Sequence, residues 1–142
     1  MQHTIFALVV SIVACLTMAG HNDHGKGKVK VLSEKEIVEK LDGVKTRVTT
    51  VEVVLEPGEA STPHRHPGPV FGYVIEGEYE WAIDDNPTRT LKAGNTFYEP
   101  TGCLHRVSKN PQKKGMSRVL AVVVHPSDAQ SIVLPETEKK KE

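Results

Sequence analysis

Cysteine is scarce in this chain and occurs at two positions, Cys15 and Cys103. Because Cys15 lies inside an apolar N-terminal run, we do not expect the two to pair, and the sequence is not that of a small domain held together by disulfides. An excess of charge of one sign is absent too, since 18 basic residues balance 18 acidic residues. Without a basic block in its body, the chain lacks the patch that neutralises phosphates, which excludes nucleic acid as a partner.

Long apolar runs are missing after the first 20 residues, and aromatic residues make up only 5% of the chain. A chain of 142 residues with 38% hydrophobic content has the composition of an ordinary globular protein. The length therefore predicts one main domain.

The N-terminal 20 residues contain no charged side chain, and their centre, residues 5–14, is continuously apolar. This pattern predicts an export signal, either a signal peptide or a lipoprotein leader. The pair Thr17 and Ala19 offers a small-residue cleavage site, whereas residues 12–15 (IVAC) resemble a lipobox in which Cys15 would be lipidated. Because Lys and Arg are missing before the apolar run, an uncleaved membrane anchor is a third alternative. Each version predicts a periplasmic, extracellular or lipid-anchored protein that contacts membrane only through the leader or lipid.

Residues 21–45 are expected to form a linker and N-terminal segment. Its first ten residues are polar and rich in Gly and Lys, as in a flexible tether. His21, Asp23 and His24 lie in this tether, where no preorganised metal site is expected. Ser33 and Glu36 have the spacing of a capping box, which predicts a short helix before Gly43.

From Thr46 onward the pattern changes to the alternation with period two that is typical of β-strands. Gly, Pro, Asn and Asp separate the apolar runs that follow. Strands are expected over residues 46–55, 71–76, 78–83, 88–91, 96–99, 104–108 and 116–125. Many short strands with no helical period between them predict an all-β sandwich or barrel over residues 46–126. Residues 127–142 are expected to hold a C-terminal strand and a disordered tail.

Three histidines are candidates for a metal site. His64 and His66 are two residues apart, so on an extended chain their side chains project to the same side. His105 follows a Pro- and Gly-containing turn at the start of another strand. Three neutral imidazoles from two strands leave coordination positions open for water or substrate, as a catalytic first-row metal requires.

The glycines and prolines around these histidines resemble the two motifs of the cupin superfamily. The first motif has Gly58, five intervening residues and His64-x-His66; the second has Gly94, five intervening residues, Pro100-x-Gly102 and His105. With the flanking strands, the resemblance covers about residues 46–125. It implies a small single-domain cupin: an all-β double-stranded β-helix, or jelly-roll barrel, with a metal inside its wide end and usually a homodimer.

The chain departs from the first cupin motif at its glutamate ligand. Val70 follows His66 after three intervening residues and Phe71 follows it after four, and neither side chain can bind a metal. Three imidazoles leave the charge of a divalent ion uncompensated, which favours an anionic substrate group or hydroxide. Three-histidine cupins resemble thiol dioxygenases, which would imply iron and dioxygen, but this chain lacks the extra elements expected of those enzymes. The metal stays open among iron, zinc, manganese, nickel and copper.

Three further side chains have two interpretations each. Glu99 could accept a hydrogen bond from a histidine N–H, but a surface carboxylate is favoured. Cys103 could point into the barrel, but a small filler on a turn is favoured. His125 ends an apolar strand and is expected there rather than at the site.

Strand alternation also predicts where the neighbours of the ligands point. Arg65 and Arg106 should lie on the outside, because each is adjacent to a ligand. Val70 and Phe71 should make the mouth of the pocket apolar. The aromatic residues of the strands are expected in core or dimer packing; they are Tyr73, Trp81, Phe97 and Tyr98.

Three functions are compatible with these features. The first is a metal-dependent enzyme that oxidises or otherwise converts a small molecule; the second is a non-catalytic barrel that binds a small molecule or metal; the third is a structural or partner-binding module. Retention of all three histidines disfavours the third. No Asp or Glu with an inward phase is evident, which disfavours hydrolysis and isomerisation more than oxygenation. The sequence assigns no catalytic residue beyond the predicted ligands.

Overall fold

The computed structural model describes residues 27–136. The expected leader, Cys15 and the histidines of the expected tether lie outside this range. Ten strands are present in it: β1 (Lys28–Leu41), β2 (Val44–Leu55), β3 (His64–Arg65), β4 (Val70–Glu76), β5 (Glu78–Ile83), β6 (Arg89–Lys92), β7 (Thr96–Glu99), β8 (His105–Lys109), β9 (Ser117–Pro126) and β10 (Leu134–Pro135).

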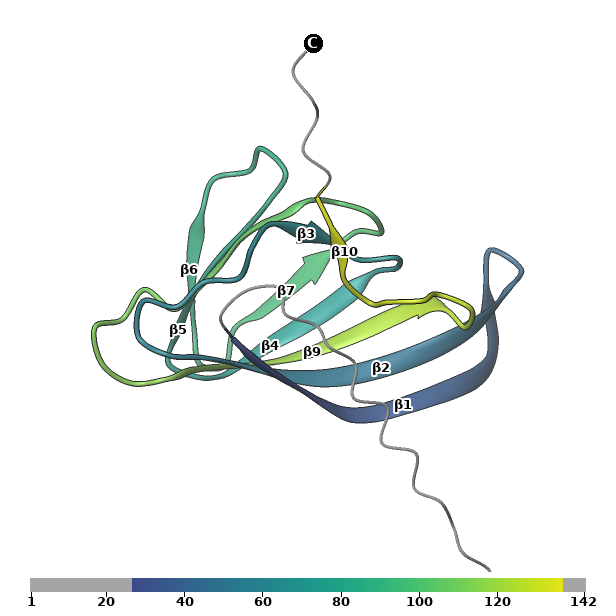
Figure 1. The fold of residues 1–142 in the computed structure, drawn as a ribbon, viewed down its shortest axis with the longest axis horizontal. Helices are drawn as coiled ribbons and strands as arrows, with labels where there is room; N and C mark the ends of the chain where they lie inside the picture. The colour runs from purple at the N-terminus through teal and green to yellow at the C-terminus, as the bar shows by residue number, and fades with distance from the viewer. Residues whose placement is uncertain (1–26, 137–142) are drawn as a thin grey trace, which may run out of the picture.

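The strands form two antiparallel five-stranded sheets. One has the order β1-β2-β9-β4-β7 and the other the order β10-β3-β8-β5-β6. In Figure 1, β3 and β10 lie above the sheet that contains β2, β9 and β4. The all-β jelly-roll prediction is confirmed. Across residues 27–136 there is no helix, and hence none able to cross a membrane.

The core lies between the two sheets, and β9 shows how the sequence builds it. Residues of β9 alternate between buried and half-buried, so Val119, Ala121 and Val123 all point inward. Leu55 and Val74 are fully buried beside them. Each valine or leucine buried in this way stabilises the fold by about 1.5–3 kcal/mol through the apolar surface it removes from water.

The helix expected before Gly43 is wrong, because that segment is the second half of β1. β1 pairs with β2 along nearly its whole length. Glu34 and Glu36, two residues apart and therefore on one face of a strand, both form ion pairs with Arg47 of β2, at 3.2 and 3.3 Å. β1 is an edge strand whose side chains are mostly exposed, so it carries no alternating apolar pattern.

Two glycines allow close approaches that position the strands around the site. A Cβ at Gly68 would lie 1.7 Å from the Val124 carbonyl oxygen, and a Cβ at Gly72 would lie 2.0 Å from the Phe97 ring. Gly72 and Phe97 are paired across β4 and β7, so the missing side chain leaves room for the ring. The chain can therefore turn tightly between His66 and β4.

Candidate metal centre

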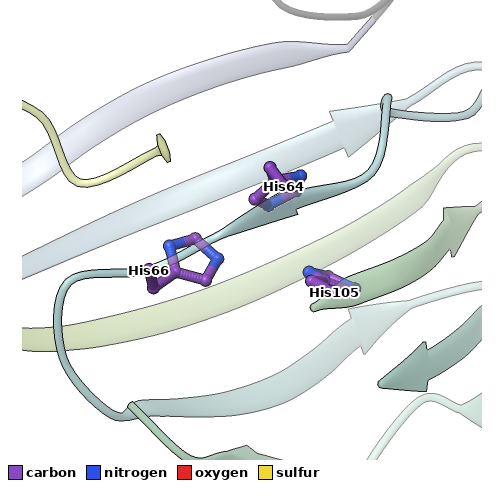
Figure 2. Close-up of side chains that lie close together, drawn as sticks. All are labelled: His64, His66 and His105. Carbon is purple, nitrogen blue, oxygen red and sulfur yellow. The ribbon is translucent and has the colours of Figure 1, made fainter. Parts of the chain in front are cut away.

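The predicted histidines come together from two neighbouring strands. His64 belongs to β3, His66 follows it directly, and His105 begins β8. His64 and His105 are direct partners in the β3–β8 register. One ring nitrogen of each histidine lies within 4.8 Å of those of the other two. Figure 2 shows the three imidazoles grouped around one space.

Backbone carbonyls fix the orientation of two of these rings. Nδ1 of His64 lies 2.8 Å from the Thr62 carbonyl oxygen, and Nδ1 of His66 lies 2.6 Å from that of Ile132. Because a carbonyl can only accept, Nδ1 must be the protonated nitrogen in both rings. Each neutral ring therefore presents the lone pair of Nε2, and the second partner that metal-bound histidines usually need is already in place.

Burial keeps all three imidazoles neutral. Loss of hydration lowers the pKa of His64, that of His66 to about 4 and that of His105 to about 3. Repulsion from His64 lowers the pKa values of His66 and His105 further. At neutral pH a metal ion would not have to displace protons from these nitrogens.

Glu99 is buried inside the barrel, which corrects the expectation of a surface carboxylate. It is 1% exposed, and its Oε1 accepts a hydrogen bond of 2.9 Å from the Trp81 indole N–H. Its Oε2 lies 3.6 Å from His66 Nε2, and its Oε1 lies 3.3 Å from His105 Nδ1. Burial raises the pKa of Glu99 to about 7, although the indole N–H opposes this shift. An inward-facing acid therefore exists, contrary to the sequence analysis.

Strand alternation carries a signal for the burial of Glu99. Phe97 and Glu99 are two residues apart on β7, so they share a face, and Phe97 packs against the core. Tyr98, between them, is 52% exposed. The sequence did not show which aromatic residue points inward, and a glutamate is rarely buried.

A cavity of about 580 Å³ adjoins the three histidines and Glu99. Its apolar wall comes mostly from β1, β2 and β9, with Val70 of β4, and the segment 129–133 also lines it. The larger apolar side chains that line the cavity are Val29, Val31, Val51, Val53, Val70, Phe97, Val119, Val123, Ile132 and Val133. The polar side chains of Arg47, Thr49 and His125 also line this cavity.

His125 lies outside the three-histidine cluster but within the wall of this cavity. It is 2% exposed, and its Nε2 is 2.9 Å from the Thr49 hydroxyl. Nδ1 lies 2.9 Å from the Pro126 carbonyl oxygen and donates to it, so Nε2 accepts from Thr49. Both ring nitrogens are thus used within the protein.

The remaining candidates have structural roles. Cys103 is half-buried and packs against the core, as a small filler does. Arg106 lies on the outside and donates to the carbonyls of Asp84 and Asn86. Val70 lines the cavity as expected, whereas Phe71 is 53% exposed and does not contribute to an apolar mouth.

Two buried atoms at the centre have no hydrogen-bond partner. They are Glu99 Oε2 and His105 Nδ1. An unpaired buried polar atom costs about 1–3 kcal/mol, more if charged. A cation among these atoms would remove that cost, so the donor set of three imidazoles and one carboxylate fits a divalent transition metal.

Comparison with known proteins assigns the family. The model of the cupin domain family matches residues 51–123, which is half of the chain. The chain is a cupin. No curated protein matches this cupin.

Solved structures share the fold of this cupin at low sequence identity. A double-stranded β-helix protein from Klebsiella pneumoniae is 22% identical, with a TM-score of 0.60, over 79% of this chain and 87% of its own. KdgF from Halomonas sp. is 21% identical, with a TM-score of 0.56, over 72% and 81%. A recombinant oxalate oxidase in complex with glycolate is 23% identical, with a TM-score of 0.56, over 81% and 57%.

Proposed function

We propose that this cupin holds one divalent transition metal at His64, His66 and His105 and uses it to bind a small molecule in the adjoining cavity. The observation that carries the proposal is the set of buried, neutral imidazoles whose ring nitrogens converge within 4.8 Å. Two of these rings are oriented by backbone carbonyls before any ion arrives. A metal site needs ligands that are oriented in advance in this way. A histidine with a purely structural role does not need to present a free ring nitrogen to a shared space.

The cavity favours a ligand with an apolar body and an oxygen-bearing end. Valine is the commonest residue on its walls, and polar side chains lie at the histidines and Glu99 and, elsewhere in the cavity, at Arg47, Thr49 and His125. A metal ion there would attract an anionic group. The structural neighbour that is an oxalate oxidase is in complex with glycolate, which makes small carboxylates the first ligands to test.

We propose oxidation of the bound molecule as the finer function, with a non-catalytic binding barrel as the alternative. A bound iron ion would supply redox chemistry with dioxygen, and any divalent ion would polarise a ligand oxygen. The chain itself contributes Glu99, which lies at the cavity and, in the metal-free protein, can hold a proton near neutral pH. Valine side chains line the same space.

Elemental analysis of the protein, purified without a histidine tag, tests the metal centre. We expect close to one transition metal per chain, lost in both His64→Ala and His105→Ala. His125→Gln is the matched control, because His125 is buried at the same cavity but outside the cluster. The proposal fails if the protein is folded, metal-free and unchanged in Tm by added iron, zinc, nickel or manganese.

Loading the protein with iron(II) separates the enzyme from the binding barrel. With glycolate or oxalate as the probe, we expect an oxidase to consume dioxygen in proportion to the amount of carboxylate added. The His105→Ala variant should consume none. Binding of the probe without dioxygen uptake supports the non-catalytic alternative. Export and a homodimer stay predictions from the sequence and the family resemblance.

A further inference from the structure

The carboxylate that is missing from β4 has a counterpart on the neighbouring strand. Val70 stands where the family resemblance places a glutamate, and in the register of β4 and β7 its direct partner is Glu99. Directly paired residues of antiparallel strands point to the same face of the sheet. Both side chains line the metal cavity. A carboxylate at position 99 thus enters the space that one at position 70 would enter.

The hydrogen bonds of Glu99 leave one oxygen free. Oε1 is held by the Trp81 indole N–H at 2.9 Å. Oε2 is buried and has no partner. The carboxylate is therefore anchored through one oxygen, and the other is aimed at the histidines.

Oε2 faces an atom that cannot donate to it. His66 uses its only N–H, on Nδ1, for the Ile132 carbonyl, so Nε2 carries a lone pair. Oε2 and Nε2 lie 3.6 Å apart. Two lone pairs at this separation repel each other unless a proton or a metal ion lies between them. Donor atoms on one metal ion at bond lengths of about 2.0–2.2 Å are separated by roughly this distance.

We propose that Glu99 Oε2 is a fourth protein ligand of the metal, so that this cupin restores a carboxylate to its site from β7 instead of β4. The inference rests on the proposed metal centre at the three histidines. The carboxylate offsets one of the two positive charges of the ion. It also adds a hard oxygen donor, which favours manganese or iron(II) relative to a site made of imidazoles alone.

The test measures metal affinity in the full chain, and Trp81 supplies the signal. Trp81 is the one tryptophan of the sequence and contacts Glu99 directly, so its fluorescence should respond to an ion at Oε2. The variant is Glu99→Gln, which keeps an oxygen for the indole N–H and removes the charge. Glu80→Gln is the matched control, because Glu80 lies next to Trp81 on β5 and pairs with Lys109 outside the site.

We expect the Kd for Mn²⁺ to rise at least tenfold in Glu99→Gln and the Kd for Zn²⁺ to rise less, with no change in Glu80→Gln. A carboxylate that only supports the fold would weaken both ions equally and lower the Tm of the metal-free protein. Equal Mn²⁺ affinity in the variant and the wild type would overturn the inference while leaving the three-histidine centre standing. A wild-type chain that binds neither ion would overturn both.

A crystal structure of the Zn²⁺-loaded wild type tests the same inference without any variant. We expect Oε2 at about 2.0–2.2 Å from the ion, as for zinc–carboxylate bonds in general. An ion held by the three histidines with Oε2 more than about 3 Å away would contradict the fourth ligand and still support the metal centre.

Discussion

Burial of ionisable side chains at the centre ties the stability of the protein to pH. His66 and His105 have pKa values of about 4 and about 3 in the fold, against 6.5 when exposed. Their contribution is fully present above pH 6.5 and is lost as the pH falls toward these values. Glu99 acts in the opposite direction, since its pKa is raised from 4.5 to about 7. Its contribution is greatest below pH 4.5 and is lost as the pH rises through 7.

We therefore expect the free energy of unfolding of the metal-free protein to fall between pH 6.5 and 4, because two histidines outweigh one glutamate. The slope is about 1.4 kcal/mol per pH unit for each net proton. Urea unfolding at several pH values measures it. Glu99→Gln should steepen the decline, since the opposing group is removed. A free energy that stays level or rises on acidification would refute this assignment of the charges.

Individual residues differed in how far the sequence could place them. The histidines were predictable, because their spacing relative to glycines and prolines reflects turns that recur in the fold. The position of Glu99 was not predictable, because its burial depends on which face of β7 points inward. Gly72 sets this face, because its missing side chain leaves room for the Phe97 ring. Gly72 and Phe97 lie on two different strands, and alternation within one strand does not show that they are paired.

At the scale of elements, strands with one buried face were predictable and edge strands were not. The expected strands at 78–83 and 96–99 coincide with β5 and β7. β1 was misassigned because, at the edge of its sheet, it buries few of its side chains. β3 and β10 contain two residues each, which is too short for a period to show.

The link between β3 and β4 offers a test of element packing. Gly68→Ala places a methyl group against backbone atoms of Val124 and His125, which cannot move aside locally. Gly72→Ala meets the Phe97 ring, a side chain that can shift. We expect Gly72→Ala to cost about 1–3 kcal/mol, the usual range for overpacking, and Gly68→Ala to cost more. Thermal unfolding of the two variants gives the ranking, and equal Tm values would show that the β3–β4 link yields as easily as a side chain.

At the scale of the whole molecule, the C-terminal segment 129–136 completes the cavity. Residues 129–133 line it, and β10 then pairs with β3, with Pro135 opposite His64. Arg65, on the outside as predicted, holds this segment by donating to Glu136 and to the Gly102 carbonyl. The segment therefore lies between the metal centre and solvent.

Removing that attachment should change metal exchange more than stability. In Arg65→Ala we expect a bound ion to be lost to a chelator several times faster, because the segment over the cavity opens more often. The free energy of unfolding should change little, as is usual for exposed ion pairs. Arg106→Ala is the control, since Arg106 is exposed and bonds two backbone carbonyls at another loop. Equal release rates in both variants would show that segment 129–136 does not govern access.

The hydrogen bond from His66 to the Ile132 carbonyl also sets an order of events during synthesis. The two residues are 66 positions apart, so a nascent chain can display all three histidines while the acceptor that orients one of them has yet to be translated. We therefore expect the fully oriented site to form only after translation has passed β9 and the loop beyond it. An interrupted chain that ends before this loop keeps its histidines but not the ring orientation, and so competes poorly for the metal of the cell.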